Sequence, residues 1–312
     1  MDKFKEKLCS NNPIIIDGGL ATYIESMGHD ISGHLWSASL LANNPQAIVE
    51  GHLAYLHAGA DIIISASYQA SRLGFMKIGF SEEESDDLIL KSIKLAQIAR
   101  DQFLRESKSN KYIFVAASIG PYGATLNDGS EYTGNYSVSS AELMRFHKDR
   151  IALLEKAGAD ILAVETIPNF QEAEILCDLL QDVPMPAWVS FACCDDRRLS
   201  DGSFLREAVK LFSSHNQVQA VGINCTPPKY INSLIKESLA GAPNQNVFVY
   251  PNSGEIYHSK DNSWSGEACD FDHDFDVIAW IDSGAKGIGG CCRTSPSHIR
   301  AIRQRLINYQ EA

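Results

Sequence analysis

The sequence predicts a single (β/α)8 barrel of the TIM type, with residues 1–312 forming one domain. Eight short, almost continuously apolar segments are spread along the chain, as expected for strands buried on both faces of a parallel sheet. Amphipathic stretches separate most of these segments, and no linker rich in Pro, Gly or Ser divides the chain. A doubly wound open sheet is the alternative, but its G-x-G-x-x-G motif is missing after the first segment.

The strands are expected where turn residues bound each apolar run. Their ranges in chain order are 13–17, 61–65, 112–118, 160–165, 187–192, 218–224, 246–250 and 286–289. A related phrase precedes three of them: HAGAD at 57–61, KAGAD at 156–160 and DSGAK at 282–286. In each phrase a helical stretch ends at a glycine, the residue typical of a helix C-cap, before the strand begins. The phrase therefore predicts the junction between a helix and a strand of a parallel sheet.

Helices are expected between the strands, for example over 86–104, 141–156 and 171–180. The acidic run at 82–87 fits the first turn of a helix, where carboxylates meet the positive end of the helix dipole. The polar segment 253–276 is long enough to form a loop over the mouth of the barrel. These elements complete the alternation that a barrel requires.

The composition excludes several classes of protein. Apolar residues make up 45% of the chain and charged residues 21%, which is too apolar for a disordered protein. The net charge of −12 argues against nucleic acid or an anionic membrane as a partner. No run is long enough to span a bilayer, and the mixed charges of the first twelve residues do not resemble a secretory signal. We therefore expect a cytoplasmic protein, whose eight cysteines do not form a disulfide framework.

Three of the cysteines fall at the carboxyl ends of the strands, where barrels of this type carry their active sites. Cys225 closes the sixth strand, and Cys291 and Cys292 close the eighth. These strand ends are about 10 Å apart, a gap that thiolates bound at about 2.3 Å to a shared Zn²⁺ can bridge. The preceding pair Gly289 and Gly290 gives the chain freedom to turn both thiols inward. From spacing alone, a zinc site and a set of buried or redox-active thiols fit about equally well.

Eight short sequence phrases match those of a known family. They are DGGLAT at 17–22, SYQA at 67–70, GPYGA at 120–124, DGSEYTGNY at 128–136, ETIPNF at 165–170, GINC at 222–225, YPNSGE at 250–255 and GGCCRT at 289–294. With them the chain resembles the homocysteine S-methyltransferases, most closely the branch that uses S-methylmethionine as methyl donor. The pairing of GINC with GGCC is specific, because it carries the three zinc ligands of that family. The resemblance favours the metal interpretation of the cysteines.

The resemblance implies a zinc-dependent enzyme of methionine biosynthesis. Cys225, Cys291 and Cys292 would bind Zn²⁺ and form the catalytic centre, with homocysteine at the open position through its sulfur. Asp17, Gly18 and Glu165 would hold the amino-acid end of homocysteine. The methyl group would pass from S-methylmethionine, or from S-adenosylmethionine, to the zinc-bound thiolate of L-homocysteine and form methionine.

Further binding residues are expected at the same rim. Asn224, next to Cys225, could hydrogen-bond substrate or brace the metal site. Ser67 and Tyr68 follow the second strand, and Tyr68, like Tyr122, could face a sulfonium by a cation–π contact. The donor is also expected to contact residues of the YPNSGE phrase, chiefly Ser253 and Glu255. The adjacent Cys193 and Cys194 are interpreted as structural, since three metal ligands are already supplied.

Other functions remain open on sequence grounds. Betaine could replace the sulfonium donor, and selenocysteine could replace homocysteine as acceptor. A zinc hydrolase would place water at the metal and would need Glu165 as its base. A thiol- or zinc-sensing barrel would need the cysteines to alternate between disulfide and metal-bound states. The leading hypothesis is a zinc-dependent methyltransferase acting on homocysteine.

Overall fold

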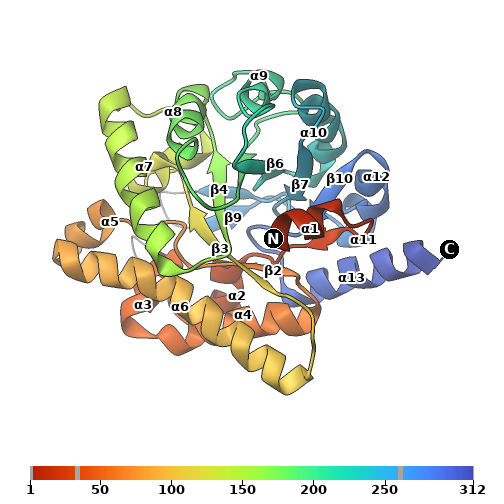
Figure 1. Cartoon of the computed structure of the whole chain (residues 1–312), viewed down its shortest axis with the longest axis horizontal. Helices are drawn as coiled ribbons and strands as arrows, with labels where there is room; N and C mark the ends of the chain where they lie inside the picture. Colours follow the sequence, from red (N-terminus) through yellow and green to blue (C-terminus); the bar gives the residue numbers. More distant parts are fainter. Residues whose placement is uncertain (1–2, 32–35, 259–262, 312) are drawn as a thin grey trace.

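A computed structural model describes residues 3–31, 36–258 and 263–311 and contains an eight-stranded parallel barrel (Figure 1). The barrel strands are β1 (Ile14–Ile15), β2 (Ile62–Ile64), β3 (Phe114–Ile119), β4 (Ile161–Ile167), β5 (Ala187–Phe191), β6 (Val218–Asn224), β7 (Asn246–Tyr250) and β10 (Ala285–Ile288). Their order in the sheet is β1-β10-β7-β6-β5-β4-β3-β2. A parallel bridge between Ile16 and Ile62 joins the two end strands and closes the ring. The predicted barrel is confirmed, and the open doubly wound sheet is excluded.

Helices surround the barrel and connect its strands (Figure 1). They are α1 (Lys3–Cys9), α2 (Leu20–Ser26), α3 (Leu40–Asn43), α4 (Pro45–Ala58), α5 (Arg72–Lys77), α6 (Glu82–Ser107), α7 (Ser140–Leu154), α8 (Phe170–Leu180), α9 (Leu205–Lys210), α10 (Pro228–Gly241), α11 (Phe271–Asp274), α12 (Val277–Asp282) and α13 (Pro296–Glu311). Short 3₁₀ helices occur at η1 (Trp36–Ser39), η2 (Tyr122–Thr125), η3 (Ser130–Tyr132) and η4 (Glu155–Ala157). The three helices expected over 86–104, 141–156 and 171–180 correspond to α6, α7 and α8.

The amino-terminal helix α1 closes the end of the barrel opposite the strands' carboxyl termini. Its Phe4 and Leu8 are buried with the inward-facing side chains of the barrel. The ring of Phe4 lies 5.6 Å from that of Phe114 at the start of β3, in an edge-to-face arrangement. The interior is therefore apolar at this end.

The acidic run at 82–87 begins α6, as expected. The Ser81 hydroxyl accepts a hydrogen bond from the Glu84 amide, and the Glu84 carboxylate accepts one from the Ser81 amide. This reciprocal pair is a capping box, and it fixes where the helix starts. The glycines of the three repeated phrases end their helices in the left-handed region, with φ of 109° at Gly59, 72° at Gly158 and 109° at Gly284. A side chain with a Cβ is strained at such angles, which explains glycine at each junction.

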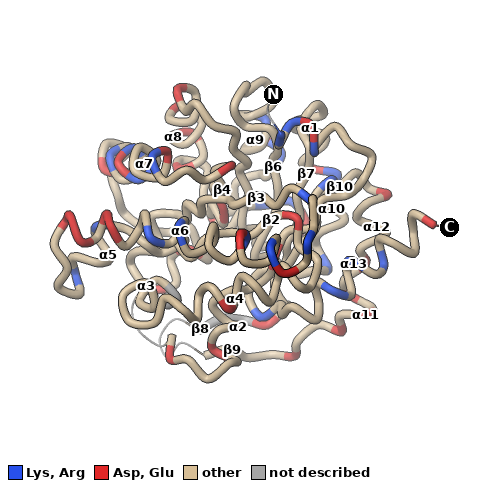
Figure 2. Tube along the Cα trace, turned by 60° about the horizontal axis from the view of Figure 1, so that its bottom comes forward, with Lys and Arg blue, Asp and Glu red and all other residues tan. Residues whose placement is uncertain are grey.

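The segment 253–276, expected to be a long loop, forms the connection between β7 and α12 and has secondary structure of its own. It contains an antiparallel pair of strands, β8 (Ile256–His258) and β9 (Ser263–Ser265), followed by α11. Residues 259–262 of this segment lie outside the described residues. Acidic and basic residues are interspersed over the outer helices (Figure 2). None of the helices described here combines the length and the apolar character needed to cross a membrane.

Candidate active site

A cavity opens at the carboxyl ends of the barrel strands. Its lining comes from many separate segments and includes Asp17, Gly18, Ser65, Tyr68, Gln69, Glu131, Tyr132, Glu165, Thr166, Asn224, Cys225, Tyr250, Gly290, Cys291 and Cys292. All three cysteines expected at the rim are among them. The charged side chains of this lining are carboxylates, and no Lys, Arg or His contributes to it in the part of the chain that the structure describes. The cavity is therefore an acidic, sulfur-rich pocket.

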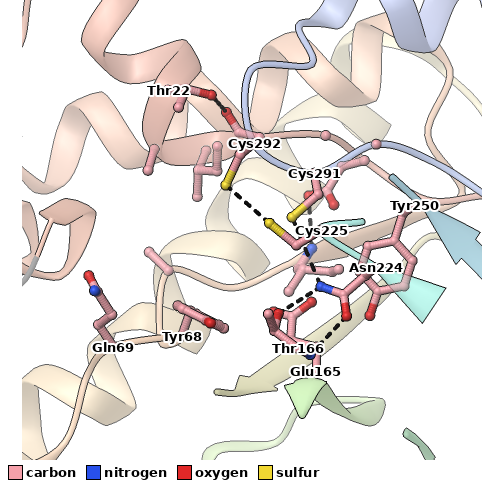
Figure 3. A pocket seen from close by; sticks show the side chains of 18 of the residues that line it. Thr22, Tyr68, Gln69, Glu165, Thr166, Asn224, Cys225, Tyr250, Cys291 and Cys292 are labelled. Carbon is pink, nitrogen blue, oxygen red and sulfur yellow. Dashed lines mark hydrogen bonds between the residues drawn. The ribbon is translucent and has the colours of Figure 1, made fainter. Parts of the chain in front are cut away.

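The three cysteine sulfurs converge at one side of this pocket (Figure 3). Their Sγ atoms lie within 4.8 Å of one another, and those of Cys225 and Cys292 are 3.6 Å apart. Cys225 directly follows β6, while Cys291 and Cys292 follow β10, which ends at Ile288. The strand has thus ended before the adjacent pair, so both of its thiols can turn toward Cys225.

Gly289 and Gly290 are needed here because neighbouring atoms approach closely. A Cβ at Gly289 would lie 2.8 Å from the Asp17 carbonyl oxygen, and one at Gly290 would lie 2.1 Å from Thr294 Oγ1. Neither glycine is among the residues with positive φ. Any larger residue would therefore push the Cys291–Cys292 turn away from the pocket.

The cysteine cluster fits a tetrahedral metal site. Sulfurs bound at about 2.3 Å to one zinc ion lie about 3.8 Å from each other, close to the spacing found here. Hydrogen bonds to the other two thiols, together with burial, raise the pKa of Cys225, so the three thiols do not all ionise unaided. Hydrogen bonds from Cys225 and Cys291 lower the pKa of Cys292. A soft divalent cation would balance three adjacent thiolates, and thiolate is a ligand that zinc prefers.

Asn224 links the metal side of the pocket to β4 (Figure 3). Its Oδ1 accepts a hydrogen bond of 2.8 Å from the Thr166 amide and one of 2.9 Å from the Ser190 hydroxyl. Its Nδ2 donates to Thr166 Oγ1 at 2.7 Å and lies 4.0 Å from Cys291 Sγ. Thr166 itself has a left-handed backbone with φ of 64°, which these bonds stabilise. The amide thus braces both a strained strand end and one cysteine.

Two buried carboxylates line the pocket at the ends of β1 and β4. Asp17 is 1% exposed, and its Oδ2 accepts a hydrogen bond from the Ile64 amide. It does not cap α2, whose N-cap is Gly19 without a side-chain bond. Glu165 accepts a 2.5 Å hydrogen bond from the Ser118 hydroxyl, and burial raises its pKa to about 8. Burial also raises the pKa of Asp17. Both groups ionise readily only beside a cation, such as an ammonium group.

Several sequence-predicted residues lie outside this pocket. Ser67 is buried behind it, where its hydroxyl donates to the Ser118 carbonyl. Ser253 and Glu255 line a neighbouring cavity, and the Glu255 carboxylate accepts hydrogen bonds from Ser253 and Arg293. Tyr122 points its hydroxyl at Glu142, away from the cysteines. Of the aromatic candidates, only Tyr68 lines the pocket.

The comparisons with known proteins agree with this geometry. The family model described as homocysteine S-methyltransferase matches residues 14–306. Homocysteine S-methyltransferase 1 of Arabidopsis thaliana is 45% identical, covering 94% of this chain and 93% of that protein. Homocysteine S-methyltransferase YbgG of Bacillus subtilis is 44% identical, with 93% of each covered. The metallated form of the homocysteine methyltransferase MmuM from Escherichia coli superposes with a TM-score of 0.86 at 41% identity, covering 97% of this chain and 99% of that one.

The chain belongs to the homocysteine S-methyltransferase family. The family resemblance carried by the eight phrases is thereby confirmed, and the protein is a methyltransferase. A dihydrodipicolinate synthase from Bacillus anthracis, at 12% identity and a TM-score of 0.50, shares only the barrel fold.

Two further residues of this homocysteine S-methyltransferase pocket were not predicted from the sequence. Glu131 and Tyr132 reach it from η3, in the connection between β3 and α7. Tyr132 contributes to the lowered pKa of Cys292. Both belong to the DGSEYTGNY phrase, which supported the family resemblance without indicating a role for any of its residues. This phrase was the sequence signal that could have located the two residues. The structure is needed to show that the connection lies over the cysteines.

Proposed function

We propose that this homocysteine S-methyltransferase depends on zinc and takes its methyl group from S-methylmethionine. One observation supports a sulfonium donor most strongly. The pocket that holds the three cysteines also contains Asp17, Glu131 and Glu165, and no cationic side chain among the described residues lines it. Such a pocket attracts cationic ligands and repels anionic ones. S-methylmethionine carries a sulfonium and an ammonium group, and homocysteine carries a second ammonium.

Cys225, Cys291 and Cys292 would hold the zinc ion, leaving the fourth tetrahedral position open. Bound zinc lowers the pKa of a coordinating thiol, so the homocysteine sulfur would be available as a thiolate at neutral pH. Asn224 restrains Cys291, and Tyr132 favours the ionised thiol of Cys292 because it lowers the pKa of that group. The description of MmuM as a metallated form lends further support to a metal at this position.

The protein residues would then bind and orient the two amino acids. Asp17 and Glu165 bind the ammonium group of homocysteine, which restores the ionised state that burial disfavours. The homocysteine thiolate forms a bond to the methyl carbon as the donor's carbon–sulfur bond breaks. The electron pair of the broken bond stays on the leaving sulfur, and two molecules of methionine result. Because opposite charges cancel in this step, a pocket that excludes water favours the transfer.

The test compares donors with one enzyme preparation. The protein is purified under reducing conditions, bound zinc is measured, and methionine formation from homocysteine is followed with S-methylmethionine, S-adenosylmethionine and betaine in turn. We expect about one zinc ion per chain and the highest kcat/KM with S-methylmethionine. Stoichiometric zinc without methionine from any donor would refute the proposal. Preference for betaine would refute the sulfonium donor while leaving the acceptor correct. Replacing homocysteine by selenocysteine tests the acceptor range.

A further inference from the structure

The pocket contains a third carboxylate, Glu131, which is not needed to bind either the metal or the ammonium group of homocysteine. Glu131 is 3% exposed and lines the same cavity as the cysteines. Its Oε2 has no hydrogen-bond partner among the described residues. A buried carboxylate oxygen without a partner is costly, so such groups are rare unless a ligand or ion supplies the partner. The position of Glu131 therefore points to a cationic ligand.

The backbone around Glu131 is tightly packed, which fixes where its carboxylate lies. Gly123 in η2 lies directly against it, since a Cβ at Gly123 would come within 2.8 Å of the Glu131 amide nitrogen. Further along the same connection, the Tyr136 hydroxyl donates to the buried carboxylate of Glu172 on α8. That carboxylate also accepts a 2.7 Å bond from the Tyr122 amide. The segment is therefore held at both ends against the body of the barrel.

The neighbours of Glu131 place it beside the reaction centre. The next residue, Tyr132, lines the cavity together with Cys292 and lowers the pKa of that thiol. The negative charge of Glu131 contributes to the raised pKa of Tyr68, which lines the same cavity. The cations that could reach Glu131 are those of a bound molecule, since no described Lys, Arg or His lines this pocket.

We propose that Glu131 binds the α-ammonium group of the methyl donor and thereby selects donors that carry an amino group. This inference rests on the proposed function, in which two amino acids occupy the pocket together. The ammonium of homocysteine is neutralised by Asp17 and Glu165, so the second ammonium requires another buried anion. Glu131 is the remaining carboxylate in the lining.

The ammonium group is a better partner for Glu131 than the sulfonium. The sulfonium loses its positive charge as the methyl group leaves, so a carboxylate in contact with it would stabilise the ground state more than the transition state. The ammonium keeps its charge throughout the reaction. A carboxylate bound there contributes equally to the ground state and the transition state, so its removal raises KM without lowering kcat.

The test uses the zinc-loaded full chain carrying Glu131→Gln, which preserves shape and removes charge. We expect KM for S-methylmethionine to rise roughly 10- to 100-fold, as for loss of a hydrogen bond to a charged group. Values of kcat, KM for homocysteine, zinc content and melting temperature should change little. The matched variant Glu165→Gln should show the reverse, with a raised KM for homocysteine. A Glu131→Asp variant retains the charge and should recover part of the donor affinity.

A second donor separates this inference from the proposed function. Dimethylsulfoniopropionate has a methyl sulfonium and a carboxylate but no amino group. The wild-type preference for S-methylmethionine over this compound should fall at least tenfold in Glu131→Gln. Calorimetric titration of S-methylmethionine into the zinc-loaded protein supplies a readout independent of turnover. An unchanged preference and an unchanged donor Kd would overturn the role of Glu131 while leaving the proposed function intact. Failure of the wild type to form methionine would refute the proposed function itself.

Discussion

The pocket has a floor and a cover that are built in different ways. Asp17 and Cys225 lie just after β1 and β6, and Glu165 lies near the end of β4. Backbone hydrogen bonds between neighbouring strands of the closed sheet therefore fix their mutual positions. Glu131 and Tyr132 belong instead to the connection between β3 and α7, which side chains attach to the barrel. The floor is therefore as rigid as the barrel. The cover depends on a few buried polar contacts, above all those of Glu172.

This difference suggests that the floor and the cover of the pocket have different functions. The floor carries the cysteines and the carboxylates that we assign to zinc and homocysteine. The cover carries the carboxylate that we assign to the donor. Changes in the floor should abolish metal binding or acceptor binding, while changes in the cover should mainly alter donor affinity.

The largest effect is expected for Cys225→Ser. Loss of one of three thiolates should remove most of the zinc and reduce methionine formation by more than about 1,000-fold, since zinc binds thiolate far better than a hydroxyl. Zinc content by mass spectrometry and the methionine assay measure both outcomes. The control is Cys193→Ser, because Cys193 is buried but outside the cysteine cluster. Full zinc retention in Cys225→Ser would show that the ligand assignment is wrong.

The barrel and the floor of its pocket could be predicted from the sequence for a physical reason. A strand buried on both faces is an apolar run, and the polar residue that ends it must lie at the rim. Asp17, Glu165 and Cys225 were found in this way, and the family resemblance selected the cysteines as metal ligands. The glycine phrases located helix ends because a left-handed backbone strongly favours glycine.

The cover could not be predicted by the same reasoning. Glu131 lies in a polar, glycine-containing stretch whose local pattern is that of any surface loop. Its burial depends on contacts with Gly123 and, through Tyr136, with Glu172, which is more than thirty residues away. Ser253 and Glu255, by contrast, follow a barrel strand and were therefore expected at the pocket. Their phrase follows β7, yet Glu255 is paired with Arg293 in the neighbouring cavity, so their role in donor binding stays a prediction.

A smaller effect is expected for Asn224→Ala, a change in the floor that removes no ligand. The variant leaves the buried Thr166 amide without its acceptor and releases Cys291 from its amide neighbour. Loss of such a supporting contact lowers metal affinity by about 10- to 100-fold. Competition with a chromogenic chelator measures this affinity. If zinc affinity is unchanged and KM for homocysteine rises, Asn224 contacts the substrate and does not brace the metal site.

Glu172→Gln tests the cover without touching the pocket. Its carboxylate accepts hydrogen bonds from the Tyr122 amide and the Tyr136 hydroxyl, and it lies 2.6 Å from His147 Nε2. An amide cannot accept from all three, so we expect a loss of about 2–3 kcal/mol in the free energy of unfolding. The loosened cover should raise KM for S-methylmethionine several-fold while zinc content stays full. Glu142→Gln, which affects only the half-buried bond to Tyr122, should have a smaller effect. Equal effects on both substrates would contradict the separation of floor and cover.

The last expected effect concerns pH. Burial raises the pKa of Glu131 to about 7, and the charge of nearby Asp128 adds to this shift. A raised pKa favours the protonated carboxyl in the folded protein, so its stabilising contribution is complete below about pH 4.5 and is lost as the pH rises through 7. Binding of a donor ammonium requires the opposite, ionised state. Between pH 8 and pH 6 the ionised fraction falls from about nine-tenths to one-tenth, so kcat/KM for S-methylmethionine should fall about tenfold through this residue alone.

The ratio of wild type to Glu131→Gln isolates that contribution. Cysteine and homocysteine thiols titrate in both enzymes, so their effects cancel when homocysteine is saturating. The wild-type advantage should be large at pH 8 and should shrink toward pH 6 with an apparent pKa near 7. Parallel pH profiles would mean that the donor does not meet an ionised Glu131. Burial also raises the pKa of Glu165 in the floor, to about 8. If the ratio of wild type to Glu165→Gln depends on pH and the ratio of wild type to Glu131→Gln does not, the donor ammonium binds in the floor.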